Sequence, residues 1–160
     1  MSKWSLYQVL GIILLVAAFI LFDWMAGDFI NVLASMESEI GMQLFVGSVI
    51  YLLVSFNYLM LYWQMQKKDS AFFDRPVWEK GPLVFGVMEG LLIVLFLWFG
   101  LAGDPVSQQW LVHAFLVLFI SVTYLLIVSI VSKYVDKDES VIKSSYAGTV
   151  VFLIVAILLV

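Results

Sequence analysis

Apolar residues are gathered into five long segments that carry almost no charge, and polar residues are concentrated in the short stretches between them. The segments cover residues 5–26, 42–63, 82–103, 110–132 and 140–160. A nearly uncharged run of about 20 residues is typical of a transmembrane helix, since a helix of that length crosses a hydrocarbon core of about 30 Å. The pattern predicts an all-α protein in which residues 1–160 form one domain, an integral membrane bundle of five transmembrane helices.

Basic residues lie on one side of the predicted bundle. All eight lysines and arginines precede the first segment, fall in the connections after the second and fourth segments, or stand at the start of the fifth. The connections after the first and third segments contain aspartate or glutamate but no cation. Because lysine and arginine near the ends of spans stay on the cytoplasmic side, we predict a cytoplasmic N-terminus and an external C-terminus. The expected location is the plasma membrane of a bacterial cell.

Tryptophan positions agree with this topology. The indole ring prefers the membrane interface, where its apolar body contacts hydrocarbon and its N–H reaches water. Each tryptophan falls at or near the end of a segment: Trp4, Trp63 and Trp78 on the cytoplasmic side, and Trp24, Trp98 and Trp110 on the outer side. The chain is therefore expected to carry two aromatic belts.

Two of the connections have patterns of their own. Apolar residues recur at helical spacing over 27–41, so we expect a short helix there that lies on the outer interface. In the connection 64–81, Phe72, Phe73 and Trp78 are expected to dip towards the lipid headgroups. Gly81 and Pro82 predict a sharp turn into the third segment, because proline suits the first turn of a helix.

Composition separates this chain from soluble domains and narrows its chemistry. Its residues are 64% hydrophobic and 12% charged, whereas soluble proteins are about 45 to 50% apolar. With no cysteine there is neither a disulfide nor a thiolate metal site. The sequence contains no metalloprotease, serine-hydrolase or phosphate-loop motif. We therefore predict no enzymatic activity, no cofactor, no metal and no nucleic-acid partner.

Glu89 is the most informative residue for function. It is the only ionisable side chain in the segment 82–103. A carboxylate inside the hydrocarbon has no water to solvate it, so it must stay neutral, find a partner or line a hydrated cavity. Glu89 is therefore the centre of a candidate proton or ligand site. The structural alternative is a single hydrogen-bonded acid in ordinary helix packing.

Polar side chains on other segments complete this candidate site. Ser55 and Tyr58 belong to a polar-edged stripe on the second segment, and Tyr124 belongs to a similar stripe on the fourth. Counted at 1.5 Å per residue, Glu89, Ser55 and Tyr124 all lie about 10 to 12 Å from the cytoplasmic boundary. Asn57 has a similar depth on the opposite face of its helix. Serine and tyrosine in membrane helices are also common in plain packing, so that alternative stays open.

Gly86 and Gly90 stand four residues apart on the third segment. Small residues at this spacing let another helix approach closely, so we predict a helix-packing surface there. Glu89 lies about 60° from Gly86 around the helix. A helix docked on the glycines would therefore be close enough to partner the carboxyl group.

His113 is the only histidine and lies three residues inside the outer end of the fourth segment. A lone histidine, in a chain without cysteine, does not make a zinc site. We expect it to hydrogen-bond at the outer face, with Asp23 of the first segment as its candidate partner.

These features favour a non-catalytic small polytopic membrane protein that serves as an auxiliary or assembly subunit of a larger membrane complex. Its connections are too short to hold an active-site domain, and its small-residue face suits a helix of another subunit or of a second copy. Membrane lipid is the remaining expected partner. Two alternatives stay open: a small proton-coupled transporter or channel that uses Glu89, and a lipophilic-ligand-binding membrane sensor whose pocket is the aromatic seam between spans.

Overall fold

The computed structural model describes residues 3–35, 39–66, 72–102, 109–135 and 138–159. Within these ranges the chain forms helices and short turns and contains no strand. Five helices are long, and α3 is a single turn: α1 (Lys3–Ser35), α2 (Glu39–Gln66), α3 (Pro76–Glu79), α4 (Gly81–Ala102), α5 (Gln109–Val131) and α6 (Asp138–Leu159). The prediction of an all-α protein is confirmed.

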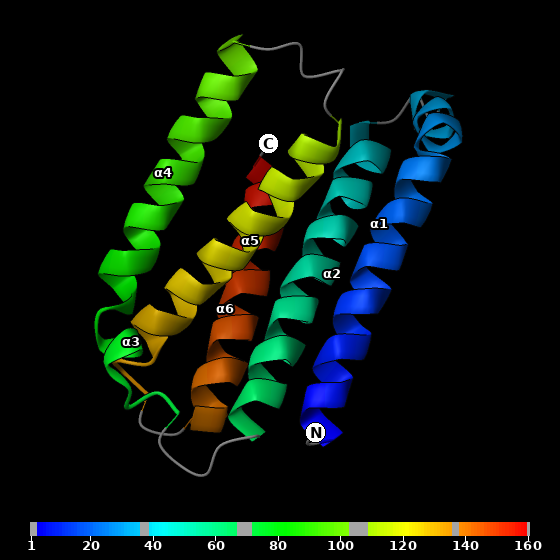
Figure 1. Ribbon diagram of the computed structural model, residues 1–160. Coiled ribbons are helices and arrows are strands. Elements are labelled where there is room, and N and C mark those ends of the chain that lie inside the picture. Colours follow the sequence, from blue (N-terminus) through cyan, green and yellow to red (C-terminus); the bar gives the residue numbers. More distant parts are fainter. Residues whose placement is uncertain (1–2, 36–38, 67–71, 103–108, 136–137, 160) are drawn as a thin grey trace.

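The five long helices alternate in direction along the molecule (Figure 1). α1 leads away from the end that holds the N-terminus, α2 returns to it, and α4, α5 and α6 alternate in the same way. The two termini consequently lie towards opposite ends of the bundle. The predicted segments 82–103, 110–132 and 140–160 differ from α4, α5 and α6 by only one or two residues at each end.

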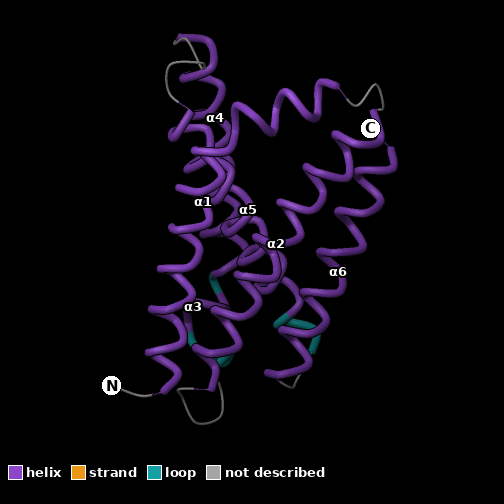
Figure 2. The backbone as a smooth tube through the Cα atoms, turned by 90° about the vertical axis from the view of Figure 1, so that its right-hand side faces the viewer, coloured by secondary structure: helices purple, strands orange, loops and turns teal. Residues whose placement is uncertain are grey.

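The far end of α1 departs from the expected pattern, because the helix continues past residue 26 to Ser35. Its last part is seen nearly end-on in Figure 1 and runs across the top of the molecule in Figure 2. The helical character expected over 27–41 is therefore found as far as Ser35, as a bent continuation of α1 instead of a separate helix. Its position at a membrane interface stays a prediction.

Two helical stretches are long and apolar enough to cross a membrane, namely Gly81–Phe99 in α4 and Ala114–Val131 in α5. A shorter apolar stretch, Lys3–Ala18, lies in α1. These stretches agree with association of the protein with a membrane. Within the described ranges no other helix reaches that length and apolarity, so the bundle of five membrane spans is not confirmed and stays a prediction.

The core of the molecule lies between α2, α5 and α6. Its most deeply buried apolar side chains come from all three helices: Val54, Tyr124, Val128, Val141 and Ile142. Small polar residues share this interior, and Ser129 and Thr149 each donate a hydrogen bond to a backbone carbonyl of their own helix, as serine and threonine commonly do in apolar surroundings. α1 packs on α2, and α4 packs on α5. α1 and α4 therefore lie at the periphery of the core that α2, α5 and α6 form.

An aromatic cluster lies at the end of the bundle, beside α3. The rings of Phe72, Phe73 and Trp78 have centroids 4.9 to 5.5 Å apart, and Phe85 of α4 joins them. Each of the first three residues exposes 9% or less of its surface. The expectation that they dip towards the headgroups is therefore wrong. A protein interior covers every face of a ring, which removes more apolar surface from water than an interface does.

Cations gather at the end of the molecule that holds the N-terminus. Lys3 opens α1, and Arg75 and Lys80 flank α3 at the same end. Near the start of α6, Lys143 Nζ lies 2.6 Å from Glu139 Oε1, with both side chains exposed. The hydrogen bond and the charge of Lys143 lower the pKa of Glu139. The one-sided placement of basic residues predicted from the sequence is present along the axis of the described bundle.

Candidate functional site

α4 and α5 form a V whose closed end lies beside α3 (Figure 1). At that end the two backbones approach closely, since a Cβ atom added at Gly81 would lie 2.5 Å from Ser129 Cβ. Glycine permits this approach because it has no side chain to keep the helices apart. Towards the other end the two helices spread apart (Figure 1).

Glu89 lies on the inner side of this V, eight residues after Gly81. Its Oε1 atom is hydrogen-bonded to the hydroxyl group of Thr123 on α5. Its second oxygen, Oε2, is buried and has no hydrogen-bond partner in the described part of the chain. No lysine or arginine of the described ranges forms an ion pair with Glu89. The carboxyl group therefore has one satisfied oxygen and one unsatisfied oxygen.

Thr123 stands between two acceptors. Its Oγ1 atom lies 2.9 Å from the carbonyl oxygen of Phe119, one turn earlier in α5, and also contacts Glu89 Oε1. A hydroxyl group carries one hydrogen, so it cannot donate fully to both oxygens. The single hydrogen of Thr123 is therefore divided between Glu89 Oε1 and the carbonyl oxygen of Phe119.

The polar residues predicted to accompany Glu89 gather elsewhere. Ser55 Oγ lies 3.0 Å from the hydroxyl oxygen of Tyr146 on α6, and the ring centroids of Tyr58 and Tyr146 are 4.8 Å apart. Tyr124 is fully buried near these two tyrosines. This hydroxyl cluster belongs to the core between α2, α5 and α6, and none of its described hydrogen bonds reaches Glu89.

The direction of side chains on α5 explains the separation. Consecutive residues of a helix point about 100° apart, so Thr123 meets α4 while Tyr124 enters the core. Asn57 is satisfied within α2, where its Nδ2 atom donates to the carbonyl oxygen of Leu53 at 2.8 Å. The residues that were predicted to share one layer therefore lie at two interfaces. Glu89 lies between α4 and α5, whereas Ser55 and Tyr124 lie in the core between α2, α5 and α6.

Thr123 and Tyr146 contact predicted site residues, but neither was predicted from the sequence. Depth was the signal that could have found the first of them. Thr123 lies nine residues from Ser132, or about 13 Å from the cytoplasmic boundary, which is close to the depth of Glu89. Depth alone gives no rotation about the helix axis, so it cannot choose between Thr123 and its neighbour Tyr124.

Gly86 and Gly90 have no close neighbour in the described part of the chain, since a Cβ atom at either position meets no atom within 4 Å. The close helix approach predicted for them is made instead at Gly81. The two glycines are thus left open on the surface of α4. The side chains of His113 and Asp23 lie outside the described residues, so their pairing at the outer face stays a prediction.

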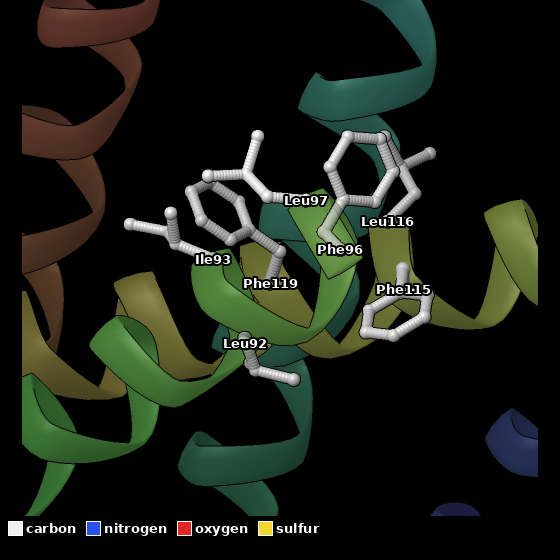
Figure 3. Close-up of a pocket in the computed structure, with 7 residues that line it drawn as sticks. All are labelled: Leu92, Ile93, Phe96, Leu97, Phe115, Leu116 and Phe119. Carbon is white, nitrogen blue, oxygen red and sulfur yellow. The ribbon is translucent and has the colours of Figure 1, made fainter. Parts of the chain in front are cut away.

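An apolar cavity of about 340 Å³ lies between α4 and α5 (Figure 3). Hydrocarbon side chains of both helices line it: Leu92, Ile93, Phe96 and Leu97 from α4, and Phe115, Leu116 and Phe119 from α5. Small-molecule sites have volumes of about 300 to 1,000 Å³ and mainly apolar walls. The sequence did not predict this cavity, because its walls are ordinary span residues and only the spreading of the two helices makes the space.

No group of three or more histidine, cysteine, aspartate or glutamate side chains suited to a metal ion occurs among the residues that the structure describes. Comparison of the chain with protein-family models, with curated proteins and with solved structures gave no match. The function is therefore inferred from the residues and geometry of this chain alone.

Proposed function

We propose that this protein is an integral membrane protein of the plasma membrane that crosses the bilayer with five helices. It has no catalytic activity of its own and serves as an auxiliary or assembly subunit of a larger membrane complex. Its docking surface is the face of α4 that carries Gly86 and Gly90. The observation that carries this proposal is the exposure of α4.

α4 is held by the rest of the described chain along one side only. It packs on α5 and, at its beginning, on α3. No residue in the range 82–99 is buried. An apolar surface of this extent is unfavourable in water, because each exposed square ångström of hydrocarbon costs about 25 cal/mol. Lipid or another membrane helix is therefore expected to cover it.

The two open glycines favour a helix as the cover for one face of α4. Glycine inside a helix is less favourable than alanine by about 0.5 to 1 kcal/mol. At Gly81 a close neighbour accounts for its presence, whereas Gly86 and Gly90 have none within the described chain. Leu83 and Val94 on the same side are 73% and 61% exposed. A helix of a partner would use the close approach that the glycine pair permits.

Replacing Gly86 and Gly90 together with leucine is expected to release the partner. The wild-type chain, extracted in a mild detergent, should copurify with another membrane subunit or with a second copy of itself. The double variant should appear in native mass spectrometry at the mass of a single chain, which is 18.2 kDa for the wild type. It should still fold, because a Cβ atom at either position meets open space.

Gly148→Leu is the matched control for this experiment, since Gly148 of α6 is equally open but lies on a different helix. Its partner should stay bound. A partner that stays with the double variant, or that is lost equally from the control, contradicts the proposed docking surface.

The proposed orientation has a separate test. A fluorescent reporter that matures only in the cytoplasm should give no signal when it is fused after Val160, and a strong signal when it is fused before Met1. This result follows from placing the basic end of the bundle on the cytoplasmic side. A bright signal from the fusion after Val160 would be incompatible with the topology.

The two alternative functions differ in their support. A proton path requires successive groups that can pass a proton to and from the acid. The described hydrogen bonds connect Glu89 to Thr123 and onwards to a backbone carbonyl, while Ser55 and Tyr146 form a separate group. For ligand binding, the cavity with hydrocarbon walls lies between α4 and α5 and not in the aromatic seam. The subunit role is therefore preferred to the transporter.

A further inference from the structure

The contacts between α4 and α5 change in kind along the V. At its closed end a Cβ atom added at Gly81 would lie 2.5 Å from Ser129 Cβ, so the two backbones approach closely there. About two turns further along α4, Glu89 Oε1 is hydrogen-bonded to the hydroxyl group of Thr123. The first contact depends on shape alone, whereas the second depends on whether the carboxyl group carries a proton.

The arrangement of α4 and α5 in the structure, with Glu89 bonded to Thr123, suits an ionised Glu89 poorly. A carboxylate can accept about four hydrogen bonds, but Glu89 Oε2 is buried and has no partner in the described chain. The donor to Oε1 is a hydroxyl group that also lies 2.9 Å from the carbonyl oxygen of Phe119. Burying a charged oxygen without a donor is far more costly than burying a neutral one. Loss of the proton therefore weakens this closed arrangement.

No charge in the described part of the chain compensates for an ionised Glu89. α4 packs on α5 and α3, and Glu89 is the only ionisable residue of α4. On α5, Tyr124 enters the core, and His113 stands ten residues, or about 15 Å along the helix axis, from Thr123. The other charged residues near the two helices stand at the closed end of the V and form no described ion pair with Glu89: Arg75, Glu79, Lys80 and Lys133.

We propose that the angle between α4 and α5 is a switch controlled by protonation of Glu89. With the proton bound, Glu89 stays bonded to Thr123 and the two helices keep the closed arrangement. When the proton is lost, α4 turns away from α5 about the contact at Gly81, and water reaches the carboxylate. A ligand, here the proton, shifts an equilibrium through its different affinity for the two states. Raising the pH therefore favours the open arrangement.

α4 can make this movement without disturbing the core. Within the described chain it packs only on α5 and α3, and no residue in the range 82–99 is buried. Further along the V, Phe115 of α5 contacts Phe96 and Phe99 of α4, with ring centroids 5.9 and 6.0 Å apart. The movement thus exchanges these ring contacts for hydration of the carboxylate, and leaves the packing of α2, α5 and α6 in place.

The distance between two spin labels, measured on the purified full chain in detergent, tests this proposal. The chain contains no cysteine, so labels attach only at introduced ones. Val94→Cys on α4 and Leu118→Cys on α5 replace side chains that are 61% and 52% exposed. From about pH 4 to about pH 9, where glutamates in proteins lose their proton, the distance should increase by at least about 3 Å, the diameter of a water molecule.

A second pair of labels is the control for a general loosening of the bundle. Leu118→Cys is combined with Val151→Cys on α6, where the side chain is 60% exposed. Because α5 and α6 belong to the core, this distance should not change with pH. An equal increase in both pairs would overturn the proposal.

Glu89→Gln separates the proton of Glu89 from other effects of pH. Glutamine has nearly the same shape as glutamic acid and stays neutral, and its amide group can donate to the hydroxyl of Thr123. The distance between the labels at 94 and 118 should therefore keep its low-pH value over the whole range. An increase that persists in this variant would assign the switch to another group. Should Glu89→Gln fail to fold, the uncharged Glu89→Met provides the same test.

Infrared spectroscopy follows the proton itself. The band of a protonated carboxyl group that is present in the wild type and absent from the Glu89 variant should disappear over the same pH interval in which the distance increases. A band that disappears while the distance stays constant would contradict the coupling. A carboxyl group that neither gains nor loses its proton over the range would leave Glu89 a packing residue, and would equally overturn the proposal.

The switch does not depend on the proposed docking surface. The distances are measured on the purified chain with no partner present, whereas the docking experiment follows copurification. A failure of either proposal is therefore visible without the other.

Discussion

Replacing Gly81 with valine is expected to lower the free energy of unfolding by about 2 to 3 kcal/mol, the effect of overpacking at a close contact. A Cβ atom at this position would lie 2.5 Å from Ser129 Cβ. That atom is attached to the backbone of α5, so rotation of a side chain cannot relieve the clash and α4 has to move away. Unfolding in a titration with sodium dodecyl sulfate, followed by tryptophan fluorescence, measures the change.

Gly86→Val is the matched control on the same helix. A Cβ atom at Gly86 meets no atom within 4 Å in the described chain, and valine is a somewhat better helix former than glycine. In the isolated chain we expect a change below about 1 kcal/mol. A loss of stability as large as that of Gly81→Val would contradict the close approach of α4 and α5 at Gly81.

Replacing Tyr124 with alanine is expected to lower the free energy of unfolding by about 3 to 5 kcal/mol, the usual effect of removing a large buried aromatic ring. Tyr124 has no exposed surface and belongs to the core between α2, α5 and α6. Three helices share the resulting space, so collapse of any one of them fills it only partly. The same detergent titration detects the change.

Tyr124→Phe separates the ring from its hydroxyl group. The hydroxyl oxygen is buried and has no partner in the described chain, so its removal should leave stability unchanged or raise it by up to about 1 kcal/mol. A loss comparable to that of Tyr124→Ala would show that the hydroxyl is hydrogen-bonded in the folded protein. That result would contradict the apolar role assigned here to Tyr124.

The positions of the helices could be predicted closely from the pattern of apolar residues. A segment in a bilayer must satisfy its own backbone hydrogen bonds, so an uncharged run of sufficient length has few options besides a helix. The predicted bounds of α4, α5 and α6 are accordingly within one or two residues of the observed helices. The end of α1 was less predictable, because residues that suit an interfacial helix also suit the continuation of the preceding one.

The connection around α3 was predicted less well. Phe72, Phe73 and Trp78 are amphipathic or apolar rings, and such rings are stabilised either at a membrane interface or in a closed core. Their sequence is compatible with both. In the structure these rings are buried in the core, beside Phe85. That contact joins two segments whose relative placement cannot be predicted from any local sequence pattern.

The sequence by itself determined that the chain is helical, where its longer helices lie, that its cations gather at one end, and that one acid stands inside an apolar run. Only the tertiary structure decided that Glu89 faces Thr123, that Gly81 instead of Gly86 makes the close approach, and that a cavity lies between α4 and α5. Spacing and depth locate a residue along a helix axis. The rotation of a span about its axis depends on packing among faces that are all apolar, so no contrast of polar and apolar positions reveals it in advance.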